Sequence, residues 1–180
     1  MVEPLHTLLT LPGWMGSDDG HWQTQWERLH GARRVEQDDW LAPEPAAWES
    51  RLEEAVQASE GQVTLVAHSL GCHLVARWAA SSPSTKRIRH ALLVAPPDLE
   101  GPGAPSELRA WTPLVAKRLP FRSLVVYSTD DPYCPPARAL ALADGWGSAT
   151  HAIGARGHVN SESHLEDWPE GYALLAKARG

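Results

Sequence analysis

Residues 63–79 read Val-Thr-Leu-Val-Ala-His-Ser-Leu-Gly-Cys-His-Leu-Val-Ala-Arg-Trp-Ala, and this stretch decides the fold. Its first residues are apolar or β-branched, which is typical of a strand buried on both faces. Its second half repeats apolar residues at helical spacing. The turn between them, Ala67-His68-Ser69-Leu70-Gly71, has a serine at its apex. A strand, a tight turn and a helix form the context in which a serine hydroxyl is held out above a sheet as a nucleophile.

The five-residue turn does not decide the function by itself. Its first position is Ala67, where glycine is usual, although alanine is also small enough for strand and helix to approach closely. The alternative is that Ser69 only caps a helix that follows a strand. The rest of the chain has to distinguish the two interpretations.

Apolar and amphipathic segments alternate along the whole chain. Such alternation predicts an α/β fold with a mostly parallel sheet of about six strands and helices on both faces. The length favours one domain over residues 1–180. The Pro- and Gly-rich residues 98–120 read as a long loop with a short helix near Leu114, and such loops often form lids or substrate-binding insertions. The expected strands are 7–11, 34–37, 63–67, 91–95, 123–128 and 148–153, and the expected helices are 22–30, 48–58, 74–79, 136–143 and 172–178.

Three catalytic residue types each follow a different predicted strand. Ser69 follows the strand at 63–67, Asp131 follows the strand at 123–128, and His158 follows the strand at 148–153. The carboxyl ends of parallel strands meet at one edge of the sheet, where sites form. Serine needs a base, and the base needs a partner that fixes its tautomer. The order Ser, Asp, His is that of the α/β-hydrolases, and it predicts a catalytic triad of these three residues.

Neighbouring residues offer alternatives for two of these positions. Asp130 is the rival of Asp131, although an aspartate in a turn commonly accepts backbone N–H groups. His164 is the rival of His158, but it lies farther past the last strand. His68 is expected to point away from Ser69 and to pack or cap, and His73 to be a half-buried polar residue of the helix.

An oxyanion hole needs two backbone N–H groups. One is expected from Leu70, the residue after the nucleophile, and the other from Trp14 in the loop after the first strand. Loop position suggests that further side chains shape an acyl pocket: Trp14, Pro96, Pro97, Trp111 and Tyr133.

Composition excludes several classes of function. The net charge is −6 and the arginines are scattered, so that no basic nucleic-acid footprint is present. Cys72 and Cys134 do not form a metal-type pair, and two cysteines are too few for a disulfide scaffold. We therefore expect neither a metal nor another cofactor. The N-terminus carries no signal-peptide pattern and no apolar run could span a bilayer, so a cytoplasmic protein without membrane contact is the expectation.

Several stretches together resemble one family of small α/β-hydrolases, the serine hydrolases that include the retinoblastoma-binding serine hydrolase and compact bacterial proteins. The resemblance covers nearly the whole chain. It implies a minimal sheet, little or no cap domain, and Ser69, Asp131 and His158 as the triad. The stretches that carry it are Leu11-Pro12-Gly13 with Trp22, Ala67 to Gly71, Ser128 to Tyr133, Gly157-His158-Val159-Asn160 and Trp168-Pro169-Glu170-Gly171.

The resemblance supports hydrolysis of a small carboxylic ester, with an amide or a thioester as alternatives of the same class. A non-catalytic binding or regulatory protein on a hydrolase scaffold is the alternative of a different class, because a fold alone does not determine function. The retinoblastoma protein is not expected as a partner. The L-x-C-x-E signature is missing, since Leu70-Gly71-Cys72-His73-Leu74 lacks the glutamate. With little to cover the site, short acyl chains are expected to be preferred.

Overall fold

The computed structural model describes residues 6–178, and in them six strands form one parallel sheet. The strand order is β2-β1-β3-β4-β5-β6. The predicted α/β class with about six parallel strands is therefore confirmed. The strands are β1 (His6–Leu11), β2 (Arg33–Arg34), β3 (Gln62–His68), β4 (Ile88–Val94), β5 (Arg122–Tyr127) and β6 (Ala149–Ala152).

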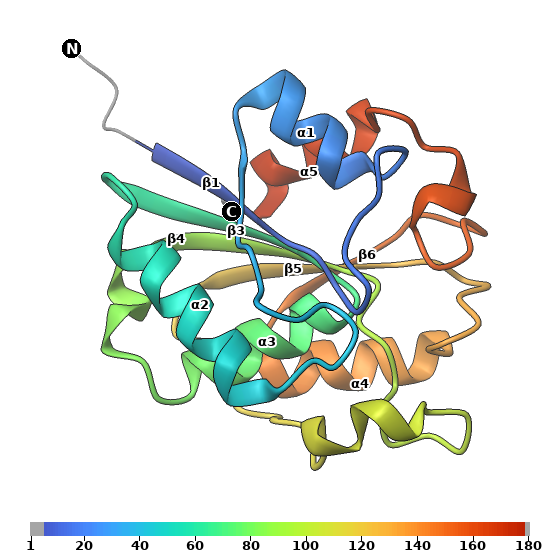
Figure 1. Ribbon diagram of the computed structural model, residues 1–180. Helices are drawn as coiled ribbons and strands as arrows, with labels where there is room; N and C mark the ends of the chain where they lie inside the picture. The colour runs from blue at the N-terminus through green and yellow to red at the C-terminus, as the bar shows by residue number, and fades with distance from the viewer. Residues whose placement is uncertain (1–5, 179–180) are drawn as a thin grey trace.

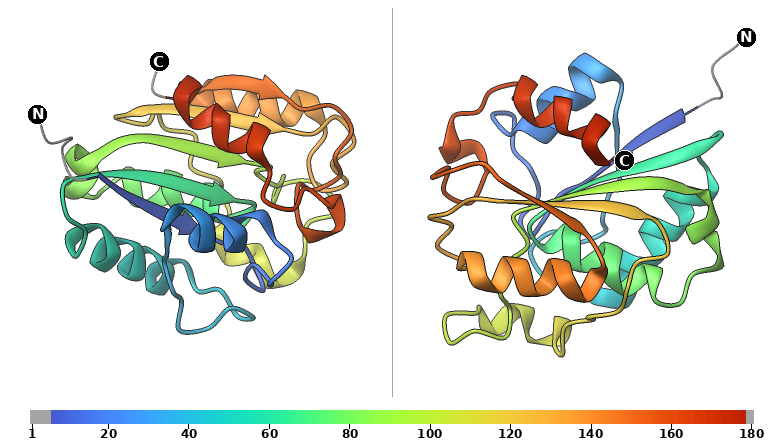
Figure 2. Two further views of the ribbon diagram at one scale, coloured as in Figure 1. Left: turned by 90° about the horizontal axis from the view of Figure 1, so that it is seen from above. Right: turned by 180° about the vertical axis from the view of Figure 1, so that it is seen from behind.

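Helices cover both faces of the sheet. Figure 1 shows α1 and α5 on one face and α2, α3 and α4 on the other, and the left view of Figure 2 looks down on the face with α1 and α5. This division follows from right-handed crossovers, because the chain moves outward from β1 to β2 and then reverses direction to add β3 to β6. The helices are α1 (Trp22–His30), α2 (Pro45–Gln57), α3 (Leu70–Ala79), α4 (Pro136–Trp146) and α5 (Pro169–Ala178).

The apolar strands divide their side chains between two cores. In β3, Leu65 and Ala67 face α2, α3 and α4, whereas Val66 faces α1 and α5. The same alternation separates Leu93 from Leu92 in β4. Strands buried on both faces need continuous apolar runs, which is why β3 and β4 were the clearest elements in the sequence.

Local capping explains several helix boundaries. The Glu44 carboxylate accepts the Ala47 N–H, and Pro45 opens α2 three residues before its predicted start. Gly31 and Gly147, both with positive φ, end α1 and α4. The prediction of a short helix near Leu114 is wrong. The long loop forms its 3-10 helix earlier, at η2 (Ser106–Trp111), because the buried indole of Trp111 anchors that turn to the Pro43 carbonyl oxygen.

Two further 3-10 turns complete the fold, η1 (Pro83–Arg87) and η3 (Ser161–Ser163). Because all strands run parallel, the loops after β1, β3, β5 and β6 gather at one edge of the sheet. The reversal of direction lies between β1 and β3, where a crevice is expected in open α/β sheets.

Candidate active site

Ser69 occupies a strained turn between β3 and α3. Its φ of 55° and ψ of −124° lie outside the regions that L-residues ordinarily adopt. The turn is fixed because the Ser69 N–H donates to the Val94 carbonyl oxygen, 2.9 Å away. Gly71 lets the helix start approach β1, since a Cβ there would lie well inside 3.0 Å of the Leu11 carbonyl oxygen. The sequence motif thus forms the strand–turn–helix geometry that exposes a nucleophile.

The His158 imidazole bridges Ser69 and Asp131. Its Nε2 lies 2.8 Å from Ser69 Oγ, and its Nδ1 lies 3.0 Å from both carboxylate oxygens of Asp131. Because a carboxylate only accepts, Nδ1 carries the hydrogen and Nε2 is free to accept the serine proton. The side chains of His158 and Asp131 are 11% and 3% exposed, so little water competes for these bonds.

Asp130 and Asp131 divide two tasks. Asp131 faces His158 and also accepts the Tyr133 N–H. Asp130 accepts the Gly157 N–H at 2.8 Å and the Ser128 hydroxyl, and the Gly157 bond is the first cause that lowers the pKa of its carboxyl. The predicted turn-capping role of Asp130 is therefore found, and it holds the backbone next to His158.

Three other histidines have surroundings of their own. His164 is exposed at the end of η3. His73 is fully buried rather than half-buried, with Nε2 2.7 Å from the Pro97 carbonyl oxygen, and burial is the main cause that lowers its pKa to about 4. His68 points toward α1, and its Nε2 lies 2.9 Å from the carbonyl oxygen of His158.

The two predicted oxyanion donors lie beside Ser69. Leu70 is the first residue of α3, where backbone N–H groups have no intrahelical acceptor. Gly13 brings the loop after β1 against it, since a Cβ on Gly13 would lie 3.2 Å from Leu70 N. The indole N–H of Trp14 donates to the Leu41 carbonyl oxygen, whereas within residues 6–178 no acceptor takes its backbone N–H. Trp14, Leu70 and Ser69 line one cavity.

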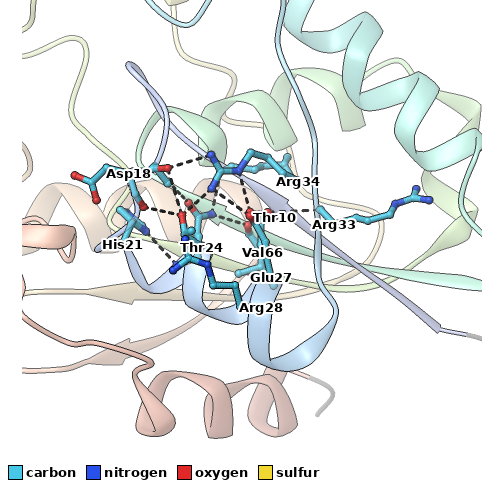
Figure 3. A network of polar contacts seen from close by, with 12 residues as sticks. Thr10, Asp18, His21, Thr24, Glu27, Arg28, Arg33, Arg34 and Val66 are labelled. Atoms are coloured by element: carbon cyan, nitrogen blue, oxygen red, sulfur yellow. Dashed lines mark hydrogen bonds and ion pairs between the residues drawn. The ribbon is translucent and has the colours of Figure 1, made fainter.

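A polar network holds the loop that carries Trp14. Figure 3 shows the Arg34 guanidinium of β2 at its centre. Arg34 donates to the Ser17 carbonyl oxygen at 3.0 Å, to Thr24 Oγ1 at 2.7 Å and to Glu27 Oε1 at 2.9 Å. The buried Gln23 amide adds bonds to the Leu11 and Val66 carbonyl oxygens. Arg34 thereby ties the loop to β2 at Ser17, and Gln23 ties α1, into which the loop runs, to β1 and β3.

Two cavities meet at His158 and Tyr133. One, of about 540 Å³, contains Ser69 and is walled by apolar residues of the long loop, with Asp98 as its charged member. The Asp98 carboxylate is paired with Arg138, 3.1 Å away. The other, of about 380 Å³, lies on the far side of Tyr133 and contains Arg156 and Glu162. A third cavity, of about 370 Å³, lies around His6 and His30 and contains none of the predicted site residues.

The predicted pocket residues are found only in part. Trp14, Pro97 and Tyr133 line the larger cavity, and Pro96 does not. Trp111 belongs to the core, where its ring packs against Trp48 at 5.6 Å. Leu99 and Leu108, which the sequence analysis did not single out, form part of the wall. Two leucines inside a Pro- and Gly-rich loop were the feature of the sequence that could have indicated an apolar wall.

The two thiols are unsuited to nucleophilic chemistry. Burial raises the pKa of Cys72 well above its ordinary value and that of Cys134 to about 12. In the described part of the chain no three His, Cys, Asp or Glu side chains are grouped so that they could hold a metal ion. None of the helices in residues 6–178 is long and apolar enough to cross a membrane.

The chain is similar in fold to several solved structures. A YdeN-like hydrolase from Pectobacterium atrosepticum is 26% identical, with a TM-score of 0.83 over 97% of this chain and 91% of that one. The ydeN product of Bacillus subtilis shares the fold at 19% identity, with a TM-score of 0.74 over 97% and 98% of the two chains. A monoacylglycerol lipase from Paleococcus ferrophilus does so at 15% identity, with a TM-score of 0.68 over 97% and 96%. A comparison with curated proteins gave no match.

The family model described as serine hydrolase matches residues 8–177, which is nearly the whole chain. The matched range contains the turn at Ser69 between β3 and α3 and the loops after β5 and β6. The chain belongs to the serine hydrolase family, and it is a hydrolase with the α/β-hydrolase type of fold.

Proposed function

We propose that this hydrolase cleaves small carboxylic esters through an acyl-enzyme on Ser69, with His158 as base and Asp131 as its partner. The observation that carries the proposal is the continuous line of hydrogen bonds from Asp131 through His158 to Ser69, at the wall of an apolar cavity. A capping serine has no need of a base at 2.8 Å.

In the first half-reaction the Ser69 oxygen bonds to the ester carbonyl carbon while His158 Nε2 takes the serine proton. Asp131 stabilises the imidazolium that forms. The N–H groups of Trp14 and Leu70 bind the oxyanion. The bond to the leaving alcohol then breaks, and Nε2 returns the proton to the alcohol oxygen.

In the second half-reaction water repeats the sequence. His158 takes a proton from the water, whose oxygen attacks the acyl carbon, and Ser69 leaves with that proton as its hydroxyl. The acid is released and the free enzyme is restored. No electron acceptor or further reactant is needed for this balance.

The two cavities fit the two halves of an ester. The larger one contains Ser69 and both oxyanion donors, so it is the place for the acyl group. The smaller one is lined by His158 but not by Ser69, and it contains the charged side chains Arg156 and Glu162. Because His158 protonates the leaving group, a polar alcohol portion belongs on this side. The preferred substrate is thus an apolar acyl group on a polar alcohol.

A fluorophosphonate probe tests the nucleophile. It should label the native protein once, at Ser69 by peptide mass spectrometry, and should not label Ser69→Ala. Turnover of a panel of esters, thioesters and amides then identifies the acyl bond that is cleaved. A folded protein that is neither labelled nor active on the panel would instead be a binding protein on a hydrolase scaffold.

A further inference from the structure

Two side-chain N–H groups hold the backbone at His158. The Nε2 of His68 lies 2.9 Å from the His158 carbonyl oxygen, and the indole Nε1 of Trp22 donates to the Val159 carbonyl oxygen at 2.7 Å. A carbonyl oxygen only accepts, so His68 Nε2 carries its hydrogen. Both donors come from elements far away in the sequence, β3 and α1.

The backbone that these donors hold is strained. Val159 is fully buried with a φ of 54°, and Gly157 has a φ of 60°. A β-branched residue in the left-handed region is an outlier, and it persists only where the surroundings impose it. Glycine adopts such a φ without cost, so the strain lies at Val159, where the partners of the loop rather than local preference impose the backbone shape.

His68 is itself fixed in place. The ring is buried, and the His21 ring meets it edge to face at 4.7 Å between centroids. Burial, followed by the neighbouring imidazoles of His21 and His158, lowers the pKa of His68 well below its ordinary value. The ring is neutral at pH 7 and has a single N–H, which goes to the carbonyl oxygen.

We propose that His68 and Trp22 are positioning residues that set the place of the His158 imidazole between Ser69 and Asp131. The proposal rests on the proposed function, in which His158 is the base. The ring bridges 2.8 Å to Ser69 and 3.0 Å to Asp131, so a displacement of the loop disturbs the geometry of these bonds. Neither positioning residue lines the two cavities at His158, so their loss should change kcat and leave KM unchanged.

Three substitutions of His68 distinguish the effect of losing the N–H donor from the effect of losing the volume of the ring. The side-chain amide nitrogen of glutamine lies about as far from the backbone as Nε2 of histidine. The amide nitrogen of asparagine extends only as far as Nδ1, and leucine has no hydrogen-bond donor. We expect His68→Leu and His68→Asn to lose roughly 10- to 100-fold in kcat, as a displaced catalytic group does. His68→Gln should return to within about threefold of the native kcat, with KM within about twofold in all three.

Trp22→Phe tests the second donor, with Trp146→Phe as its matched control. Each removes a buried indole N–H from a backbone carbonyl oxygen, that of Val159 at 2.7 Å and that of Val115 at 2.8 Å. Both should lower the melting temperature, but only Trp22→Phe should lower kcat. This pair decides the question if His68→Leu does not fold.

The proposal is overturned if folded His68→Leu keeps the native kcat, if glutamine and leucine are equally impaired, if KM rises in step, or if the two tryptophan variants lose the same activity. The low-field proton resonance of His158 Nδ1–H provides a readout in the unreacted protein. It should shift or broaden in His68→Leu and Trp22→Phe and remain in His68→Gln and Trp146→Phe. If the four variants show this pattern of resonances but the native protein hydrolyses no ester, the proposed function would be disproved while the positioning role of His68 and Trp22 would stand.

Discussion

Substitution of Gly71 by alanine should destabilise the protein, although alanine is the better helix former. The added Cβ would lie well inside 3.0 Å of the Leu11 carbonyl oxygen, 3.1 Å from the Leu11 carbonyl carbon and 3.3 Å from its Cβ. Two of these atoms are backbone, fixed in β1 by the ladder with β3. Overpacking costs about 1–3 kcal/mol or more, and we expect the upper end because backbone cannot rotate away. The gain in helix propensity offsets at most about 1 kcal/mol.

The net loss of about 2 kcal/mol or more corresponds to a fall in Tm of roughly 4–8 °C for a chain of this size. Gly103→Ala is the control, because a Cβ there meets nothing within 4 Å and its effect on the unfolded chain is the same. Calorimetry of the two variants measures the difference. A Gly71→Ala protein that melts at or above the Gly103→Ala protein would refute the close approach of α3 to β1. Ester turnover should fall with the Tm, because the helix start that moves carries the Leu70 N–H.

Three further outcomes can be measured on the same protein. His158→Ala should lower kcat on the order of a thousandfold or more while His164→Ala stays mostly active, and the reverse result would move the base to His164. Burial lowers the pKa of His21 and His73 from 6.5 to about 4, so the unfolded chain takes up protons first as pH falls. The contribution of these two histidines to the free energy of unfolding should therefore be fully present above pH 6.5. It should decrease toward pH 4 by up to about 1.4 kcal/mol per pH unit for each histidine. A free energy from urea unfolding that is independent of pH would contradict this. With an alcohol held constant, kcat/KM should rise about fourfold per added CH₂ of a short acyl chain and level off once the apolar cavity is filled, whereas a steady rise through long chains would exclude the short-chain preference.

The strands and the order of the site residues could be predicted because both are local in origin. β3 and β4 are buried on two faces, so their apolar runs identify them without tertiary information. Parallel strands bring their carboxyl ends together, so the loops at Ser69, Asp131 and His158 had to meet once the class of fold was recognised. The sequence also distinguishes the adjacent aspartates correctly in geometry, because Asp131 is the one that faces the imidazole.

What the sequence could not provide depends on contacts between distant segments. An aromatic residue reads the same in a core as in a pocket, so Trp111 was expected at the cavity although it packs in the core. The alternation of side chains along β3 correctly turns His68 away from Ser69. It does not indicate that the loop at His158, 90 residues later, packs on that face and that its carbonyl oxygen accepts the His68 N–H. The η2 turn likewise depends on the anchoring of Trp111 rather than on helix propensity.

The covering of α1 by the end of the chain has a consequence during synthesis. Trp22 and Trp26 are completely enclosed in the folded protein, and their rings pack against Trp168 and Tyr172. On the ribosome, the 137 residues from Gln23 to Val159 take roughly 7–27 s to be made at about 5–20 residues per second. Throughout that interval the nascent chain presents two indoles that still lack the cover of Trp168 and Tyr172, and transiently exposed apolar surface of this kind is what makes chaperones necessary. Ribosomes stalled before the α5 codons should therefore carry chaperone-bound, protease-sensitive chains, and native resistance should appear only after release.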